Sequence, residues 1–320
     1  MARMSRTLLL ALAALSAAFA GEEPASPEPV LTLEGHMSLI GGLAFTPDGK
    51  TLLSAGSYVD ATLCLWDAAS GELKQSIRGE KGSVSCLALS RDGKTLAVGG
   101  GDATLRLLDP ASGKTLRALA RHKGGVNAVA ISRDGKLLAT ACDGDEAVRL
   151  WGVDKGEVLH AMTIRWGAHS VAFSPDGMVL AGGGRFGRLI LWGVGTGTPA
   201  ASPYIGKGKV TVAFSPDGTM LASGSDSATV RLFAPRGGKL LRTLPHCAPN
   251  TPLAFSPDSK LLATGGPEGA VKLWCPQTAQ LLATLKGHKG AISALAFSPD
   301  GKTLASGSED RTINLWEVRK

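Results

Sequence analysis

The sequence predicts an all-β protein in which seven four-stranded antiparallel sheets close into one ring. Three observations predict this fold class. One turn motif recurs seven times at nearly constant spacing, and each copy lies between short runs of alternating apolar residues. The 320 residues include 42 glycines, close to twice the usual ~7%. Length alone would suggest two domains, but the internal repetition favours one repeating architecture.

The recurring turn has the form Ser/Thr-Pro/Arg-Asp-Gly, with a final Ser in one copy. Its aspartates are Asp48, Asp92, Asp134, Asp176, Asp217, Asp258 and Asp300, which are 44, 42, 42, 41, 41 and 42 residues apart. Pro presets φ at the second turn position, Asp bonds to its own backbone, and Gly supplies a positive φ. Each copy therefore predicts a hairpin that joins the first two strands of a unit.

A third and a fourth strand are expected in each unit. The third ends in a bulky residue, namely Trp66, Leu108, Trp151, Trp192, Phe233, Trp274 and Trp316. An apolar stretch such as QLLATLKG follows and predicts the fourth strand. Four short strands per ~42 residues indicate a closed ring of sheets. A stacked solenoid is the alternative, but it needs polar end caps, which the sequence does not show.

These repeats resemble the WD-repeat β-propeller family over residues 30–320, essentially the whole chain after its first 29 residues. The family's Gly-His pair occurs at Gly35-His36 and Gly287-His288, and its Trp-Asp pair is literal only at Trp66-Asp67. One such dipeptide has little meaning, but seven related positions in register are specific. The resemblance implies seven blades of four strands each.

The two ends of the repeat predict how the ring closes. Only four residues follow Trp316, so the seventh unit lacks a fourth strand of its own. The segment Val30-Leu31-Thr32-Leu33 precedes the first Gly-His, where every other unit has its fourth strand. We therefore expect the N-terminal strand to complete the last blade by pairing with residues 312–316, which leaves no gap in the ring and protects the exposed sheet edges.

The family resemblance also implies a hydrogen-bonded chain of His, Ser or Thr, Asp and Trp inside a blade. Three units match all four positions: His36, Ser54, Asp60 and Trp66; His122, Thr140, Asp145 and Trp151; His288, Ser306, Asp310 and Trp316. A buried Trp Nε1–H needs an acceptor, which a hydroxyl provides. The other units depart from this pattern, and the fourth has Ile164 and Phe186 at the His and Asp positions.

No catalytic or cofactor site is predicted. A Ser–His–Asp set suggests a hydrolase, but it occurs three times and without a G-x-S-x-G motif. The six histidines lack metal-ligand spacing, so we expect no metal, and no glycine-rich phosphate loop precedes a helix. The five cysteines are odd in number and without CxxC, so they predict neither a disulfide framework nor a zinc site. No cofactor is expected.

The N-terminus predicts export to the periplasm or the exterior. Residues 1–20 combine two arginines, an apolar run and the ending Ala18-Phe19-Ala20, which are typical of a signal peptide cleaved after Ala20. A retained membrane anchor is the alternative, although the run is shorter than the ~20 residues of a span. Residues 21–29, GEEPASPEP, predict an extended tether. No transmembrane span is expected after cleavage.

The predicted function is a non-catalytic scaffold that binds other proteins or peptides, as the resemblance implies. The net charge of +7 is spread without a basic run, so nucleic acid is not an expected partner, and the chain by itself is expected to be a monomer.

The candidate binding residues lie in loops that lead into first strands or join second to third strands: Tyr58, Arg165, Trp166, His169, Arg185, Phe186, Arg188, Tyr204, Lys207 and Lys209. Trp, Tyr and Arg are enriched in binding hot spots, so we expect an aromatic and basic patch for acidic protein segments. Two alternatives for Trp166 and Phe186 remain open: binding, or repacking of a blade that lacks the polar chain. A carbohydrate- or envelope-binding propeller and a propeller enzyme are the alternative functions.

Overall fold

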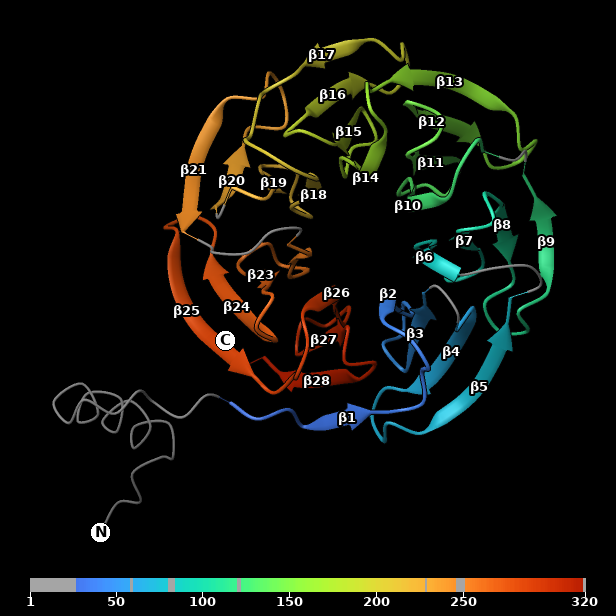
Figure 1. Ribbon diagram of the computed structural model, residues 1–320, viewed down its shortest axis with the longest axis vertical. Coiled ribbons are helices and arrows are strands. Elements are labelled where there is room, and N and C mark those ends of the chain that lie inside the picture. Colours follow the sequence, from blue (N-terminus) through green and yellow to red (C-terminus); the bar gives the residue numbers. More distant parts are fainter. Residues whose placement is uncertain are drawn as a thin grey trace, which may run out of the picture.

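The protein forms a ring of seven four-stranded antiparallel sheets around a central axis, as the computed structural model shows (Figure 1). The structure describes residues 27–57, 60–79, 84–119, 122–227, 229–245 and 251–318. We call the sheets blades 1 to 7 in the order of their first strands. The predicted fold class is confirmed.

Each blade has four strands, which run from the innermost strand at the central channel to the outermost strand at the rim of the ring. The innermost strands are β2 (Ile40–Phe45), β6 (Val84–Leu89), β10 (Val126–Ile131), β14 (Ala168–Phe173), β18 (Thr211–Phe214), β22 (Leu253–Phe255) and β26 (Ile292–Phe297). The second strands are β3 (Thr51–Gly56), β7 (Leu96–Gly100), β11 (Leu137–Cys142), β15 (Val179–Gly184), β19 (Leu221–Gly224), β23 (Leu262–Gly265) and β27 (Thr303–Ser308). The third strands are β4 (Thr62–Asp67), β8 (Leu105–Leu108), β12 (Ala147–Gly152), β16 (Leu189–Gly193), β20 (Thr229–Phe233), β24 (Ala270–Cys275) and β28 (Ile313–Glu317). The outermost strands are β5 (Leu73–Arg78), β9 (Thr115–Ala118), β13 (Val158–Thr163), β17 (Pro199–Ala201), β21 (Leu240–Pro245), β25 (Gln280–Lys286) and β1 (Leu31–Leu33).

The seven recurring turns join first to second strands and share one hydrogen-bond pattern. In blade 2, Ser90 Oγ donates to Asp92 Oδ1 (2.6 Å), which also accepts from Lys94 N (3.0 Å). Gly93 closes the turn with a φ of +72°, which a residue with a side chain adopts only with strain. These bonds direct the carboxylate back into its own turn. We call the face that carries these turns the turn face, and the opposite face the loop face.

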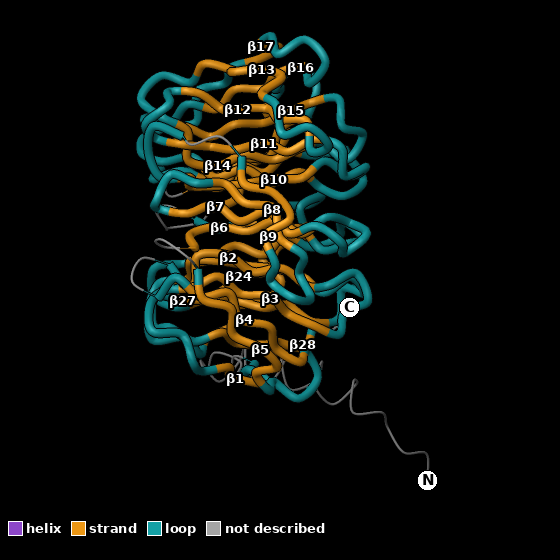
Figure 2. Tube along the Cα trace, turned by 90° about the vertical axis from the view of Figure 1, so that its right-hand side faces the viewer, coloured by secondary structure: helices purple, strands orange, loops and turns teal. Residues whose placement is uncertain are grey.

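The hydrophobic core lies between neighbouring blades rather than at the centre of the ring. One cluster joins Leu105 and Leu107 of blade 2 to Val126, Leu138 and Trp151 of blade 3. Figure 2 shows the ring on edge, with loops on both faces of the stacked strands. Because each blade packs against a neighbour on both sides, closing the ring leaves no blade with an uncovered face.

Polar side chains of the innermost layer tie several blades to the next. Asn127 Nδ2 donates to Ala168 O (2.9 Å), and Ser170 Oγ donates to Val210 O (2.6 Å). The same kind of bond joins the last blade to the first, from Ser293 Oγ to Ile40 O (2.6 Å). These bonds satisfy carbonyl groups at the channel wall and fix the angle between blades.

Closure by the N-terminal strand is confirmed. β1 pairs antiparallel with β28, and Leu31, Thr32 and Leu33 lie opposite Leu315, Asn314 and Ile313. Thr32 Oγ1 also donates to Asn314 Oδ1 (2.8 Å). Strands 282 residues apart in the chain therefore complete blade 7.

The predicted signal peptide, residues 1–20, and most of the predicted tether lie outside the described residues. Within the part of the chain that the structure describes, there is no helix with the length and hydropathy that a membrane span requires.

Candidate functional site

Blade 1 contains the complete polar chain that the sequence predicts. Trp66 Nε1 donates to Ser54 Oγ (2.8 Å), and Ser54 Oγ lies 2.7 Å from His36 Nε2. The other ring nitrogen of His36 lies 2.6 Å from Asp60 Oδ2. Burial opposes ionisation of Asp60, but hydrogen bonds from Thr62, His36 and the Met37 amide outweigh it and lower the pKa of the carboxyl group. Each buried polar atom of the chain is satisfied, which rigidifies the blade.

Blade 7 repeats this chain. Trp316 Nε1 donates to Ser306 Oγ (2.8 Å), which lies 2.8 Å from His288 Nε2. His288 Nδ1 lies 3.1 Å from Asp310 Oδ2. Burial raises the pKa of Asp310, but hydrogen bonds from Thr312 and the Lys289 amide dominate and lower it to about 2.

Blade 3 departs from the predicted chain. Trp151 Nε1 donates to Thr140 Oγ1 (2.9 Å), and His122 Nδ1 bonds to Asp145 Oδ2. The expected link between them is absent, because His122 Nε2 has no hydrogen-bond partner among the described residues. Cys142 stands where blade 1 has Gly56, beside the His–Asp pair, and its thiol contacts Gly124 O (3.1 Å).

The cluster of His122, Cys142 and Asp145 also brings three metal-ligand atoms within 4.8 Å of one another. Two features oppose metal binding there. Arg149 already forms an ion pair with Asp145 (3.1 Å), and burial raises the pKa of the Cys142 thiol, whereas a metal ligand must be a thiolate. Cys64, Cys86, Cys142 and Cys275 are free thiols, and Cys247 lies outside the described residues.

Blade 4 has an apolar interior in place of the polar chain. Ile164, at the histidine position, is 0% exposed. Gly182 stands where blade 1 has Ser54, and a Cβ on Gly182 would lie 2.5 Å from Trp192 Cζ3. Phe186, at the aspartate position, turns outward and is 61% exposed. The interior of blade 4 is therefore filled without Phe186.

Trp166 and Phe186 form an exposed aromatic pair on the loop face of blade 4. Their ring centroids lie 5.6 Å apart at an interplanar angle of 81°, and the Arg188 guanidinium lies 5.7 Å from the Trp166 ring centroid. Trp166 is 48% exposed. Tyr204, which is 68% exposed, is brought alongside by a backbone bridge between Arg188 and Tyr204. We call Trp166, Phe186, Arg188 and Tyr204 the aromatic patch.

Both aromatic residues of the pair have left-handed backbone. The φ of Trp166 is +66° and that of Phe186 is +57°. This conformation costs ~1–2 kcal/mol for a residue with a Cβ. Left-handed backbone also occurs at Ala61, Ala103, Glu146 and Arg311 in the equivalent loops of other blades, so in blade 4 the distinguishing feature is that two large aromatic residues adopt it. This strain could not be read from the sequence, in which both positions looked like ordinary substitutions.

Some of the basic residues around the aromatic patch form ion pairs with described residues, and others do not. Arg185 forms an ion pair with Asp143 (2.8 Å). Arg165 and Lys207 are exposed, and neither forms an ion pair with a described residue. The positive charges beside the aromatic patch that no described carboxylate pairs with are therefore those of Arg165, Arg188 and Lys207, whereas the charge of Arg185 is already balanced.

His169 and Lys209 lie apart from the aromatic patch, at the channel. They line a hollow of about 590 Å³ on the loop face, together with Asn127, Ser293 and Glu309. The structure thus separates the candidate residues into a surface patch and a channel mouth. Tyr58 lies outside the described residues.

The sequence model of the family described as WD domain, G-beta repeat, matches residues 27–67, 71–109, 113–152, 202–233, 238–275 and 279–317. Blade 4 lies between the third and fourth matched segments, in agreement with its apolar interior. No curated protein matches the chain.

Proposed function

The chain belongs to the WD40-repeat family, and we propose that it is a non-catalytic platform that binds a partner protein through the loop face of blade 4 and the adjoining part of blade 5. The aromatic patch carries this proposal, because it combines exposure and hot-spot chemistry at one place. Propellers of this family commonly serve as protein-interaction scaffolds.

Exposure favours binding over the alternative that Trp166 and Phe186 repack blade 4. A repacking residue would be buried, as Ile164 is at 0% exposure, whereas these two side chains are 48% and 61% exposed. Large exposed aromatic surface is unfavourable in water unless a partner covers it. Burying one such side chain in an interface contributes ~2 kcal/mol or more.

The charges of the rim favour an acidic partner segment. Arg188 over the Trp166 ring leaves its guanidinium edge free to bond a carboxylate. Arg165 and Lys207 add free positive charge nearby, and Lys209 lies at the adjoining channel mouth. We therefore propose a partner segment in which an apolar or aromatic side chain, which packs on the Trp166–Phe186 pair, stands next to Asp or Glu.

The decisive experiment is affinity capture of the partner, followed by the double variant Arg165→Glu/Arg188→Glu, since Arg185 is already paired with Asp143. This charge reversal should remove specific partners identified by mass spectrometry, and Trp166→Ala should weaken their binding by about 2 kcal/mol. Arg117→Glu/Arg242→Glu is the matched control, because β9 and β21 carry these exposed arginines on the outer rim. An unchanged partner list in the loop-face double variant would contradict the proposal.

We also propose that the platform acts after export, on the basis of the signal-like residues 1–20. Loss of Arg3 and Arg6 leaves 32 basic and 27 acidic residues, or +5. Intact-mass measurement of the protein isolated from its source should show a chain that begins at Gly21. A chain that retains residues 1–20 would instead indicate a membrane anchor.

A further inference from the structure

The turn face carries a second depression whose chemistry differs from that of the loop face. A hollow of about 740 Å³ lies at the channel mouth on this face. Four half-buried phenylalanines line it, one from the end of each of β14, β18, β22 and β26: Phe173, Phe214, Phe255 and Phe297. Apolar side chains that remain partly exposed around a hollow form a surface that a partner can cover.

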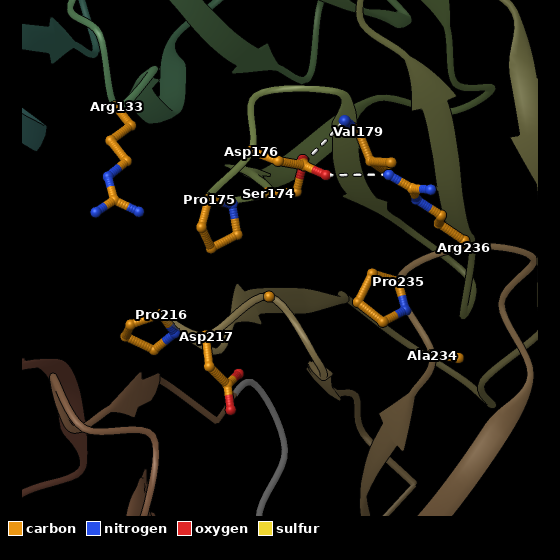
Figure 3. A pocket seen from close by; sticks show the side chains of 11 residues that line it. Arg133, Ser174, Pro175, Asp176, Val179, Pro216, Asp217, Ala234, Pro235 and Arg236 are labelled. Carbon is orange, nitrogen blue, oxygen red and sulfur yellow. Dashed lines mark hydrogen bonds and ion pairs between the residues drawn. The ribbon is translucent and has the colours of Figure 1, made fainter.

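The depression continues outward between blades 4 and 5. A second hollow, of about 520 Å³, shares Arg133, Ser174, Pro175 and Pro216 with the first. Figure 3 shows Arg133 on one side of Pro175 and the ion pair of Asp176 with Arg236 (3.4 Å) on the other. Because they share four lining residues, the two hollows form one continuous depression.

Two arginines interrupt the ring of prolines around this depression. Six residues at the second position of their turns border the hollow at the channel mouth, and four of them are proline. The other two are Arg91 and Arg133, from the neighbouring blades 2 and 3. Proline fits this turn position and stabilises it through the unfolded state, so arginine is not needed there for the fold.

Neither guanidinium is neutralised within the described part of the chain. Arg91 and Arg133 are exposed and form no ion pair with a described residue. The nearest acidic residues in sequence point elsewhere. Asp92 Oδ1 accepts from Ser90 Oγ and Lys94 N, and Asp134 Oδ1 accepts from Ser132 Oγ (2.6 Å) and Lys136 N (3.1 Å).

The charge of the turn face is therefore polarised across the channel mouth. The turns of blades 2 and 3 each carry an arginine, an aspartate and a lysine, which gives a net positive charge. The turns of blades 4 and 5 carry Asp176 and Asp217 without a cation within the turn, and Asp176 is paired with Arg236. A segment with acidic residues at one end and apolar residues in its middle complements this arrangement.

We propose that this depression is a second peptide-binding site, in which acidic residues of a partner peptide bond Arg91 and Arg133 while an adjoining apolar side chain enters the phenylalanine-lined channel mouth. This site lies on the face opposite the aromatic patch and does not depend on it. Two independent faces would let the propeller hold two different proteins at once.

The test is selection of random 12-residue peptides displayed on phage against the full chain without residues 1–20. Selection on the wild type should enrich peptides in which Asp or Glu precedes an aromatic or aliphatic residue. The synthetic form of the most enriched peptide should bind Arg91→Glu/Arg133→Glu at least ~10-fold more weakly, because each arginine provides a charge-assisted hydrogen bond. Lys260→Glu/Lys302→Glu, which makes the same charge change on the same face outside the depression, should bind as the wild type does.

The outcomes separate this proposal from the loop-face proposal. Arg165→Glu/Arg188→Glu should leave the affinity of the turn-face peptide unchanged. Failure to obtain any peptide that depends on Arg91 and Arg133 would overturn the second site and leave the loop-face site standing. Displacement of the peptide by millimolar inorganic phosphate, with no effect of replacing its apolar residue by Ser, would also overturn it, since the site would then bind anions without regard to peptide.

Discussion

Blades 1 and 4 have the same four-stranded topology but opposite interiors. In blade 1, four polar side chains from different strands and loops form one buried chain of hydrogen bonds. In blade 4, Ile164, Gly182 and Trp192 fill the same space without any such chain. The interior of a blade can therefore be filled either by the polar chain or by apolar side chains. Replacing every member of a buried polar network by apolar groups can be energetically neutral.

In a blade with an apolar interior, the loop residue at the Asp position does not have to hydrogen-bond to a buried His. Asp60 of blade 1 is buried because His36 and Thr62 bind its carboxylate. Phe186 at the same position of blade 4 has no such partner and lies on the surface beside Trp166. A blade without the polar chain can therefore present large side chains at its loops, and blade 4 does so.

The largest effect that distinguishes the two blades is expected for Ser54→Ala. This change leaves Trp66 Nε1 and His36 Nε2 buried without a partner, and each orphaned group costs ~1–3 kcal/mol. The free energy of unfolding, measured by urea denaturation, should fall by about 3 kcal/mol. Ser223→Ala is the matched control, because Ser223 occupies the same position in blade 5 and makes one bond, to Thr211 O (3.1 Å). Equal losses in the two variants would contradict the account of blade 1.

A smaller effect is expected from acid. The folded pKa of Asp310 is lowered to about 2, so its stabilisation is present above the ordinary value of 3.8 and is lost as the pH falls toward 2. This carboxylate should contribute about 2 kcal/mol at neutral pH. Urea midpoints at pH 5, 4 and 3 should decline less steeply for Asp310→Asn than for the wild type. Parallel pH profiles of the wild type and Asp310→Asn would show that the blade 7 network does not hold the carboxylate ionised. Blade 4 has Phe186 at the equivalent position and therefore contributes no such dependence of stability on pH.

The smallest effect on stability is expected for Trp166→Gly, which installs the residue that blade 3 has at the equivalent position, Gly124. Removing a left-handed Trp relieves strain, while the lost ring contacts are half exposed. The free energy of unfolding should therefore stay constant or rise by up to ~1 kcal/mol, whereas partner binding should weaken by about 2 kcal/mol. A fall of ~2 kcal/mol or more would assign Trp166 to blade packing instead.

The fold could be predicted from the sequence because the same turn, with the same hydrogen bonds, recurs in every unit. Seven turns with the same Ser/Thr and Asp hydrogen bonds predict seven hairpins, and the surplus strand at residues 31–33 predicts the closure. The sequence did not indicate that the polar chain of blade 3 is incomplete. All four residue types are present, but the missing link between His122 and Thr140 depends on how Cys142 and its neighbours pack.

The candidate site was predicted by residue type and not by arrangement. Departures from the repeat indicated Trp166, Phe186, Arg188 and Tyr204, which the structure brings together. The ion pair of Arg185 with Asp143 and the location of His169 and Lys209 in the channel depend on contacts between blades. The arginines of the turn face were visible in the sequence as part of the turn motif, but only the ring placed them on one hollow.

The most direct test of the loop-face account is hydrogen–deuterium exchange of the chain with and without its captured partner. Binding at the aromatic patch should slow exchange of the amides of residues 164–168 and 185–189 in blade 4. The equivalent segments of blade 1, residues 36–40 and 60–63, should exchange at the same rate with and without partner. Protection confined to blade 1, or to blades away from 4 and 5, would contradict the account.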